Sequence, residues 1–495
     1  MRLFGTNGIR EVVGEALAAP FVTRVAGAIA SEFAPGKPIV VGMDGRTSSP
    51  AFARIISGTL ALAGHDVIDV GVLPTPAIQY NVTRLGAQLA VIVTASHNPR
   101  EFNGIKCIAA DGLEISRETE QAIESGVAAG RGATVPYDRI GEISLRTDGA
   151  RRYVDAILAQ VDVARIRARH FTIVLDCGNG ASVPTAPALL RRLGCRVVTL
   201  NGNLDGTFPG HLSEPTEENL GDLQRMVPAV GADLGIAHDG DADRTVFVDA
   251  SGRYVAGEEI LTLLAEDAVR RHSGGVVVTP LSASQSVEDA VSAAGGTVVY
   301  TRIGSPVVTH ELQTRHGIFG GEENGGLIFP EFQLARDGGM TAAAVLDLLS
   351  RREKSLADVL VGLPRYSLIK AKEPVPVALR EAVLARVTER LRAGSDRVVT
   401  IDGVKAFRDG GWILVRASGT EPLFRVFAES KDRARAQALS NAGLEALRSA
   451  VAELGSDAPG GHGTRPAHRV PSRPRRPSGS AGRSRRAPRG AGRGH

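Results

Sequence analysis

The sequence predicts an α/β protein with three related mixed α/β domains, a smaller C-terminal α+β domain around a central cleft, and a disordered basic tail. Its length of 495 residues exceeds the ~250–300 residues over which a single core normally grows. Aliphatic, strand-like runs alternate with helix-like periodic runs through most of the chain, which is typical of βαβ units. The last third instead carries several strand-like runs in succession, which favours antiparallel pairing.

Domain I is predicted over residues 1–145. A strand-like run at residues 37–44 leads to the polar turn DGRTSS and to a helix-like segment at 50–64. Further strand-like runs follow at 66–72 and at 88–93, the second of which is QLAVIV. Short aliphatic runs bounded by turn residues predict buried strands.

The same pattern then restarts twice. Domain II, predicted over residues 146–250, contains FTIVLDCGNGASV, which echoes VVGMDGRTSSPAF of domain I as strand, aspartate, glycine turn and helix. Domain III, predicted over residues 251–363, contains the strand-like runs GVVVTP and TVVYTR and the stretch HGIFGGEENGG. We therefore expect three similar units in a row.

Domain IV is predicted over residues 364–455. It has a helix-like segment near 379–392, four short strand-like runs (RVVTIDG, VKAFRDG, GWILVRA, LFRVFAE) and a second helix-like segment at 433–447. The remaining residues, 456–495, hold ten arginines, one acidic residue and almost no aliphatic or aromatic residues, so we expect them to be disordered.

The net charge of +4 comes from this tail, which carries +9, while the rest of the chain carries −5. A basic tail binds polyanions non-specifically, but a net acidic body does not favour nucleic acid as the main partner. Aliphatic runs are too short for a membrane span and the first residues lack a secretion signal. Three cysteines without metal-type spacing fit a reduced compartment, so we expect a cytoplasmic protein.

The first chemical motif is TASHNP, residues 94–99, directly after the strand-like run that ends at Val93. Open α/β sheets place their chemistry at the carboxyl ends of strands. The proline disfavours helical backbone at Asn98, so the turn is expected to be stiff and to display the hydroxyl of Ser96. The alternative for this motif alone is an ordinary polar turn.

The second motif is AHDGDADR, in which Asp239, Asp241 and Asp243 alternate after an aliphatic run. Three carboxylates this close repel one another unless a cation lies among them. Oxygen-only ligands favour Mg²⁺, and Ala250 at the twelfth position argues against an EF-hand. An acidic turn in solvent is the alternative.

Three further loops carry polar groups. GGEENGG, at 320–326, offers Glu322 and Asn324 between glycines, a combination suited to sugar hydroxyls or to a plain flexible turn. RASGTEPLFR, at 416–425, combines two arginines and two hydroxyls around a glycine, which fits a phosphate cradle or a solvated hairpin. FGTNGIR, at 4–10, is a glycine-bracketed loop that ends in a guanidinium. Taken together, the loops indicate one site for a phosphorylated sugar.

With these motifs in this order, the chain resembles the α-D-phosphohexomutase superfamily from FGTNGIR to RASGTEPLFRV, that is, over all but the tail. TASHNP resembles the phosphoserine loop of that family, DGDADR its metal loop, GEENG its sugar-recognition loop and RASGTEP its phosphate-binding loop. GGEENGGLIFPEF and RDGGMT most resemble the archaeal branch, which contains phosphoglucosamine mutases and phosphomannomutase/phosphoglucomutases.

The resemblance implies a role for each matching residue. Ser96 would carry the phosphoryl group and, with the three aspartates, hold Mg²⁺; His97 would orient the phosphate. Arg10 and Arg244 would add positive potential, and Lys106 would act as acid or base. The substrate-binding residues would be Arg244, Arg302, Glu322, Asn324, Arg416, Ser418, Gly419, Thr420 and Arg425.

The implied reaction interconverts hexose 6-phosphate and hexose 1-phosphate through a hexose 1,6-bisphosphate, which is also the activator. Glucosamine 6-phosphate is the expected substrate, with mannose or glucose phosphates as the alternative. Many bacterial relatives have a serine and a histidine where this chain has Asn324 and Gly326, which leaves Lys106 as the acid/base candidate.

Two other classes of function stay open. A Mg²⁺-dependent sugar phosphatase needs the same nucleophile and acidic loop, and would release inorganic phosphate without a bisphosphate activator. A nucleic-acid-binding protein would act through the tail, which the net acidic body does not favour, and removal of residues 456–495 should leave catalysis intact. The sequence gives no indication of the oligomeric state.

Overall fold

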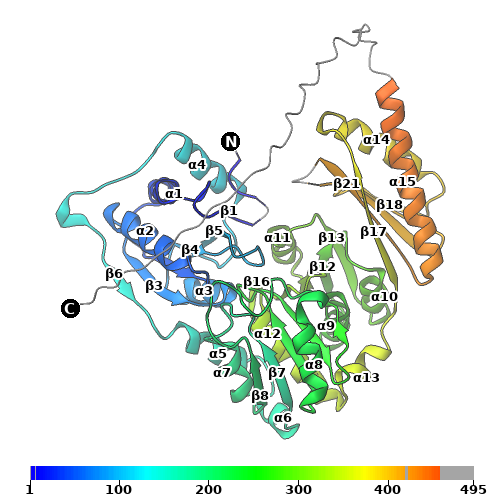
Figure 1. Cartoon of the computed structure of the whole chain (residues 1–495), viewed down its shortest axis with the longest axis horizontal. Helices are drawn as coiled ribbons and strands as arrows, with labels where there is room; N and C mark the ends of the chain where they lie inside the picture. The colour runs from blue at the N-terminus through cyan, green and yellow to red at the C-terminus, as the bar shows by residue number, and fades with distance from the viewer. Residues whose placement is uncertain (1, 6, 419–421, 457–495) are drawn as a thin grey trace, which may run out of the picture.

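The computed structural model describes residues 2–5, 7–418 and 422–456. Predictions for Gly419, Thr420 and the tail from residue 457 therefore lie outside the described residues. The described chain forms four β-sheets. Figure 1 shows them following one another along an arc, from the blue N-terminal domain through green to the yellow and orange C-terminal domain.

The first sheet has six strands in the order β1-β5-β4-β2-β3-β6. Strands β4, β2, β3 and β6 pair in parallel, and β5 and β1 join antiparallel at one edge. Its elements are β1 (Ile9–Val12), α1 (Ala19–Glu32), β2 (Ile39–Met43), α2 (Ser49–Leu62), β3 (Val67–Val72), α3 (Thr75–Arg84), β4 (Leu89–Val93), β5 (Phe102–Ala109), α4 (Arg117–Ala128), η1 (Tyr137–Arg139) and β6 (Ile143–Leu145).

The second sheet has the order β11-β10-β9-β7-β8 and the third the order β13-β12-β14-β15-β16. The second part consists of α5 (Gly149–Leu158), α6 (Val163–Ala168), β7 (Thr172–Asp176), α7 (Ala186–Arg192), β8 (Arg196–Leu200), η2 (Glu217–Leu220), α8 (Gly221–Ala229), β9 (Leu234–His238), β10 (Thr245–Asp249) and β11 (Tyr254–Val255). The third consists of α9 (Gly257–His272), β12 (Val276–Pro280), α10 (Gln285–Ala293), β13 (Thr297–Thr301), α11 (Ser305–Arg315), β14 (Phe319–Gly321), β15 (Leu327–Phe329), β16 (Gln333–Arg336), α12 (Gly338–Arg352) and α13 (Leu356–Val361).

The three α/β sheets share one topology, which places their loops in equivalent positions. In each sheet the third strand of the parallel set turns back into an antiparallel neighbour: β4 into β5, β9 into β10, and β14 into β15. The TASHNP, DGDADR and GEENGG motifs lie at these three turns. The repeat that the sequence predicts is therefore confirmed, and it brings three different loops to the same place in each unit.

The fourth sheet is antiparallel throughout, in the order β17-β21-β20-β19-β18. The RASGTEP motif lies at the turn between β20 and β21. The elements of this part are β17 (Ser367–Pro374), η3 (Val377–Leu379), α14 (Arg380–Arg392), β18 (Arg397–Val399), β19 (Val404–Arg408), β20 (Gly411–Ala417), β21 (Leu423–Ser430) and α15 (Arg433–Ser456).

Most predicted elements agree with the structure. The helix-like segments at 50–64 and 379–392 form α2 and α14, and the segment at 433–447 forms α15, which continues to Ser456. FGTNGIR is not a loop throughout, because its last two residues begin strand β1 and pair with β5. The second sheet also continues past residue 250, since β11 pairs with β10.

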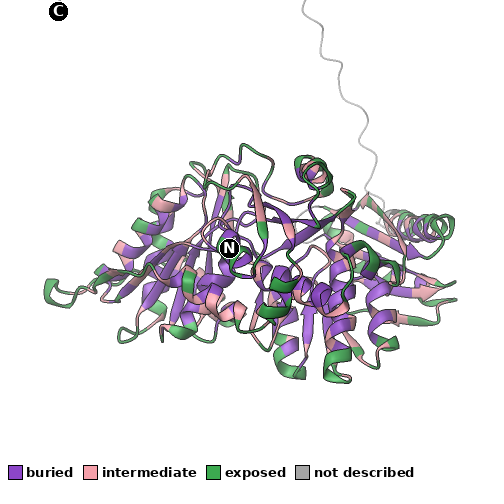
Figure 2. Cartoon of the chain, turned by 90° about the horizontal axis from the view of Figure 1, so that it is seen from below, coloured by how far each residue is buried: buried purple, intermediate pink, exposed green. Residues whose placement is uncertain are grey.

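Most of the hydrophobic core of domain IV is separate from that of the first three domains, although Leu281 of domain III packs with Trp412 and Leu414 of domain IV. One cluster of buried side chains extends from Val40 to Leu360 through domains I to III, whereas domain IV has its own cluster from Val375 to Ala450. Figure 2 shows buried residues along the sheets and exposed residues on the outer helices. Within the described residues, no helix is long and apolar enough to cross a membrane.

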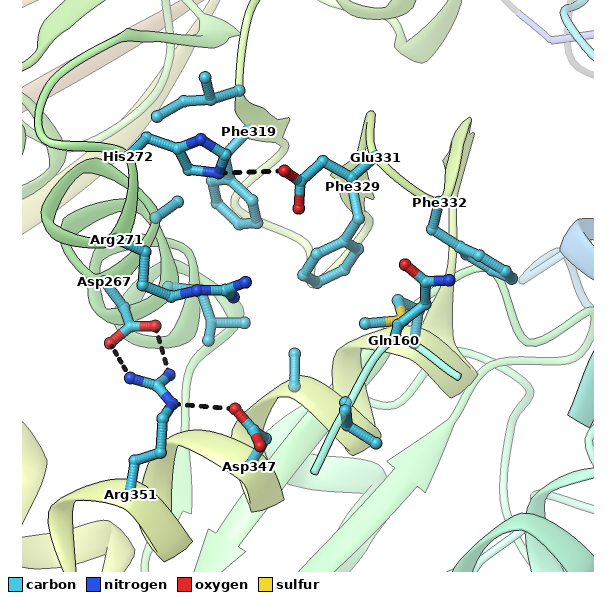
Figure 3. Close-up of a pocket in the computed structure, with 16 residues that line it drawn as sticks. Gln160, Asp267, Arg271, His272, Phe319, Phe329, Glu331, Phe332, Asp347 and Arg351 are labelled. Carbon is cyan, nitrogen blue, oxygen red and sulfur yellow. Dashed lines mark hydrogen bonds and ion pairs between the residues drawn. The ribbon is translucent and has the colours of Figure 1, made fainter. Parts of the chain in front are cut away.

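Domains II and III meet at a small pocket, drawn in Figure 3. Its walls include Phe319, Phe329 and Phe332. At one side Arg351 forms ion pairs of 2.6 Å with Asp267 and 2.9 Å with Asp347. None of the predicted site residues that the structure describes lines this pocket, and the ion pair between Arg351 and Asp267 joins helices α12 and α9.

Candidate functional site

Ser96 lies just after β4 and is completely buried. Its φ angle of 52° is in the left-handed region, which is uncommon for residues other than glycine and costs energy. The hydroxyl of Thr94 accepts a hydrogen bond of 2.9 Å from the backbone nitrogen of Ser96. The strained turn therefore fixes the direction of the Ser96 hydroxyl.

Arg46, in the DGRTSS turn of domain I, supports the loop that contains Ser96. Its guanidinium donates hydrogen bonds of 2.6–2.9 Å to four backbone carbonyls, those of Ser96, Asn98, Pro99 and Phe102. The carboxylate of Asp44 accepts a further bond of 3.0 Å from Arg46 Nε. Arg46 is buried, so the loop has a rigid ionic foundation.

The hydroxyl of Ser96 contacts the acidic loop of domain II. Ser96 Oγ donates a hydrogen bond of 3.0 Å to Asp239 Oδ2. The two loops approach so closely that a Cβ on Gly240 would lie 2.5 Å from the carbonyl oxygen of Ser96. The structure thus unites the first and second motifs, as the sequence predicts.

Asp239, Asp241 and Asp243 are buried, and one oxygen of each lies within 4.8 Å of the others. Thr75 at the start of α3 donates a 2.7 Å hydrogen bond to Asp241 Oδ2, and the backbone nitrogen of Arg244 donates one of 3.2 Å to Asp239 Oδ1. The other oxygens of Asp241 and Asp243 are buried without a hydrogen-bond partner in the part of the chain that the structure describes.

Burial, together with the charges of Asp241 and Asp243, raises the pKa of Asp239 well above its usual range. Burial also acts to raise the pKa of Asp241, but the Lys106 ammonium and the Thr75 hydroxyl hold that pKa below its usual value. Two features are expected of a cation site that holds no cation. Some carboxylate oxygens are buried without a hydrogen-bond donor among the described residues, as in Asp241 and Asp243, and one carboxyl group retains its proton, as in Asp239. The residues present fit a hard divalent ion.

The GEENG loop lies against the same acidic loop. The backbone nitrogen of Thr245 donates a 3.1 Å hydrogen bond to the carbonyl of Gly325. Glu322 accepts a 2.8 Å hydrogen bond from Nη1 of the buried Arg336, and Arg336 Nη2 binds Asp243 Oδ2. Asn324 lies on the same loop and lines a cavity with Glu322 and Arg336.

Basic side chains lie near Ser96. Arg10 Nη1 donates a 2.9 Å hydrogen bond to Asn98 Oδ1, and Arg244 Nη1 lies 3.2 Å from Glu214 Oε1. His97 Nδ1 lies 3.5 Å from Ser96 Oγ. Burial and the nearby guanidinium groups of Arg244 and Arg10 lower the pKa of His97 to about 3, so its imidazole is neutral at physiological pH.

Lys106 lies on β5, as its strand-like surroundings predict, and is buried beside the cleft. Its Nζ is 3.9 Å from Glu114 Oε1. Arg302 is exposed and lines the same cavity as Lys106 and Arg416. The structure therefore brings a lysine–carboxylate pair and two guanidinium groups to one cavity.

On domain IV, Arg416 and Arg425 are direct cross-strand partners in β20 and β21, one on each side of the turn that contains Ser418. Directly opposed residues in an antiparallel pair lie on the same face of the sheet. Arg416 Nη2 lies 3.2 Å from Asp402 Oδ2, which also accepts a hydrogen bond from the backbone of Ile303 in domain III.

Two adjoining cavities join these loops. One, of about 450 Å³, is lined by Arg10, His97, Arg244, Glu322 and Arg336; the other, of about 500 Å³, by Lys106, Arg302, Asp402 and Arg416. Both include Gly5, Gly8 and Gly304, so they form parts of one cleft. The cleft is large enough for a sugar phosphate.

Sequence reasoning missed the arginines that hold these loops. Arg46 lies in the DGRTSS turn and Arg336 in RDGGMT, and neither was assigned a role. A charged residue in a turn that follows a strand was the sequence signal that could have pointed to Arg46. Asp402 was missed as well, and its short exposed loop carries no comparable signal.

The chain matches the models of the four phosphoglucomutase/phosphomannomutase domains: the alpha/beta/alpha domains I, II and III at residues 1–133, 151–252 and 256–366, and the C-terminal domain at 368–445. It is 38% identical over 454 residues to a phosphoglucomutase/phosphomannomutase of Thermococcus kodakarensis, covering 91% of this chain and 99% of the relative.

Two further comparisons agree. A phosphoglucosamine/phosphogalactosamine mutase of Sulfurisphaera tokodaii is 37% identical over 444 residues, covering 89% of this chain and 98% of the relative. The crystal structure of a phosphoglucomutase/phosphomannomutase family protein from Burkholderia thailandensis superimposes with a TM-score of 0.80 at 28% identity, covering 91% of this chain and 97% of that structure.

Proposed function

This chain belongs to the phosphoglucomutase/phosphomannomutase family, and we propose that it converts glucosamine 6-phosphate into glucosamine 1-phosphate through a phosphoserine at Ser96. The observation that carries the proposal is the 3.0 Å hydrogen bond between the buried Ser96 Oγ and Asp239 Oδ2, whose loops reach a cleft through His97 and Arg244 while the other three motifs line the rest of it. The surroundings of this hydroxyl suit a group that accepts a phosphoryl group, because buried carboxylates can bind a cation and guanidinium groups lie nearby.

Asp239, Asp241 and Asp243, with an oxygen of phosphorylated Ser96, would hold Mg²⁺. When bound, this ion would neutralise the oxygens of the transferring phosphoryl group. Arg10 and Arg244 add positive potential at the entrance, and neutral His97 is placed to donate a hydrogen bond to the phosphate. The rigid support from Arg46 keeps the serine oxygen in line with the incoming hydroxyl.

The reaction would consist of two transfers. Phosphorylated Ser96 first gives its phosphoryl group to the free hydroxyl of the hexose monophosphate, which yields a 1,6-bisphosphate. The bisphosphate then turns around within the cleft and returns its other phosphoryl group to Ser96. As a neutral amine, Lys106 would take the proton of the attacking hydroxyl; Glu114 would orient the ammonium that results, which would return the proton to the leaving oxygen of Ser96.

While the bisphosphate reorients, its non-reacting phosphate group needs a separate binding site. Arg416, Ser418, Arg425 and the adjacent Gly419 and Thr420 would hold it, with Arg302 on the facing wall. Glu322 and Asn324 would read the ring hydroxyls. Because domain IV has its own core, it can close over the substrate and exclude water. The proposed domain limits are 1–145, 146–250, 251–363 and 364–455.

The choice of an amino sugar rests on the Sulfurisphaera tokodaii relative, named for glucosamine and galactosamine phosphates, whereas the Thermococcus kodakarensis relative is named for glucose and mannose phosphates. The test is turnover of glucosamine, mannose and glucose 6-phosphates with the matching 1,6-bisphosphate as activator. The proposal requires glucosamine 6-phosphate to have the highest kcat/KM; a higher value for either other sugar would transfer the specificity to it.

The same assay separates a mutase from a Mg²⁺-dependent sugar phosphatase. A phosphatase would release inorganic phosphate in proportion to substrate consumed and would not respond to the bisphosphate. A mutase conserves the phosphate on the sugar. Deleting residues 456–495 should leave kcat/KM unchanged, because the tail takes no part in the proposed reaction.

A further inference from the structure

Arg336 is the last residue of β16 and is buried, with 7% of its surface exposed. Its backbone is held at the next residue, Asp337. The nitrogen of Asp337 donates a 2.9 Å hydrogen bond to the carbonyl of Leu327, and the Asp337 carboxylate caps helix α12 by accepting from the nitrogen of Met340 at 2.8 Å. The guanidinium therefore projects into the cleft from a rigid base.

This guanidinium joins two loops of different function. Nη1 binds Glu322 of the sugar-recognition loop at 2.8 Å, and Nη2 binds Asp243 of the metal loop. An arginine guanidinium is always charged, and a charged pair of this geometry has directional hydrogen bonds.

The space for Arg336 is provided by Gly326. A Cβ on Gly326 would lie 2.4 Å from Arg336 Cδ and 3.3 Å from its Cγ. Gly326 is not among the residues with positive φ, unlike its neighbours Gly321 and Gly325. Its backbone conformation is therefore open to any residue, and glycine is needed there for room.

We propose that Arg336 is the positioning residue of the sugar-binding site and that Gly326 is its matched partner. Arg336 holds Glu322 through Oε2, so that Oε1 is not engaged by this guanidinium, and Glu322 lines the cavity; Arg336 also links Glu322 to the metal loop through Asp243. The bound sugar is thereby kept in a fixed position relative to Ser96 and the metal loop. The role in sugar binding rests on the proposed function; the pairing with Gly326 does not.

The pairing is tested by the melting temperatures of four proteins: the unmodified chain, Gly326→Ala, Arg336→Ala and the double variant. Gly326→Ala should lower Tm on its own and should have no effect once Arg336 is alanine. An equal decrease in both backgrounds would overturn the pairing. If Arg336→Ala does not fold, the same cycle in a Glu322→Gln background removes one of the carboxylates left unpaired. Gly58→Ala is the control, because a Cβ there meets nothing within 4 Å.

The positioning role is tested by calorimetric binding of glucosamine 6-phosphate and, separately, of inorganic phosphate. Arg336→Met should weaken binding of the sugar phosphate by about tenfold or more, the effect of a hydrogen bond to a charged group. Binding of inorganic phosphate, held by domain IV, should not change. Equal weakening of both would show a structural effect and would overturn the role.

Arg351→Met is the matched control, because Arg351 also binds two carboxylates but lies in the domain II–III pocket (Figure 3). It should change neither affinity. If the unmodified protein binds and converts none of the three hexose 6-phosphates, the proposed function fails. The melting cycle still decides the pairing of Arg336 with Gly326 in that case.

Discussion

The hydroxyl of Ser96 donates a hydrogen bond to Asp239, 143 residues further along the chain. This contact joins the turn after β4 of domain I to the turn after β9 of domain II. Since both turns follow equivalent strands of related sheets, the repeated topology itself accounts for how two distant polar loops meet. The predictions below follow from this contact and from the groups that support it.

Replacing Arg46 should disable the serine loop. Arg46→Met removes the donor for four carbonyls and leaves Asp44 buried without its cation, although the hydroxyls of Ser49 and Thr94 still donate to it. Breaking a buried ion pair on one side costs about 3–5 kcal/mol. We expect a lower Tm and a kcat reduced far more than KM is changed.

Arg46→Lys serves as the comparison, because it restores the charge without the planar set of donors. It should recover part of the Tm and little of kcat. A Lys variant with full kcat would show that charge alone, rather than the four carbonyl contacts, supports the loop.

Metal binding should compete with protons. The pKa of Asp239 is raised in the folded protein, so its carboxyl holds a proton at pH values where a free aspartate is ionised. Without metal, folding stability should therefore fall as pH rises from the usual pKa of aspartate toward that of Asp239. Mg²⁺ should bind more tightly with increasing pH and release protons, which calorimetry in buffers of different ionisation enthalpy measures.

The variant Asp239→Asn should separate these effects. It removes one of three mutually repelling carboxyls, so the metal-free protein should be at least as stable near neutral pH. The stabilisation by Mg²⁺ that the unmodified protein shows should be lost. Undiminished stabilisation of this variant by Mg²⁺ would place the metal elsewhere.

How far the site could be foreseen depends on where each residue lies. Ser96 and the three aspartates are recognisable because each motif directly follows an aliphatic strand, and strand ends in α/β sheets carry chemistry. Arg46 and Arg336 act on partners 50 and 93 residues away in sequence. Neither residue type nor spacing indicates such partners, because Arg46 meets the serine loop only through the folding of domain I and Arg336 meets Asp243 only through the packing of domain III against domain II.

The fold shows the same division. Aliphatic periodicity predicts the strands and helices and the restart of the pattern, and the boundaries agree closely for α2 and α14. It does not predict that β1 extends from the N-terminal loop or that β11 prolongs the second sheet, because both are short edge strands defined by their pairing.

Domain IV should depend on one buried lysine for its attachment. Lys405 Nζ donates hydrogen bonds of 2.9 and 3.0 Å to the carbonyls of Leu281 and Ala283 in domain III. Lys405→Met leaves both carbonyls without this donor, at a cost of about 1–3 kcal/mol for each unsatisfied buried group. Hydrogen exchange around residues 281–285 should increase.

The control for this variant is Lys431→Met. The Lys431 ammonium is exposed, and its ion pair with Asp289 is long at 3.9 Å. Exposed pairs contribute little to stability, so exchange should not change. Protection of residues 281–285 that survives Lys405→Met would mean that the other contacts, namely the bond from the nitrogen of Gln285 to Glu429 and the packing of Trp412 and Leu414, are sufficient to attach domain IV.

The most direct measurement follows the phosphoryl group on Ser96. Protein phosphorylated with an isotopic label at Ser96, confirmed by peptide mass spectrometry, is mixed with unlabelled glucosamine 6-phosphate and Mg²⁺ in a single turnover. Our account predicts that the label leaves Ser96 and appears on the sugar as the 1,6-bisphosphate and then the monophosphates. Label that stays on the protein, or that appears only as inorganic phosphate, would contradict it.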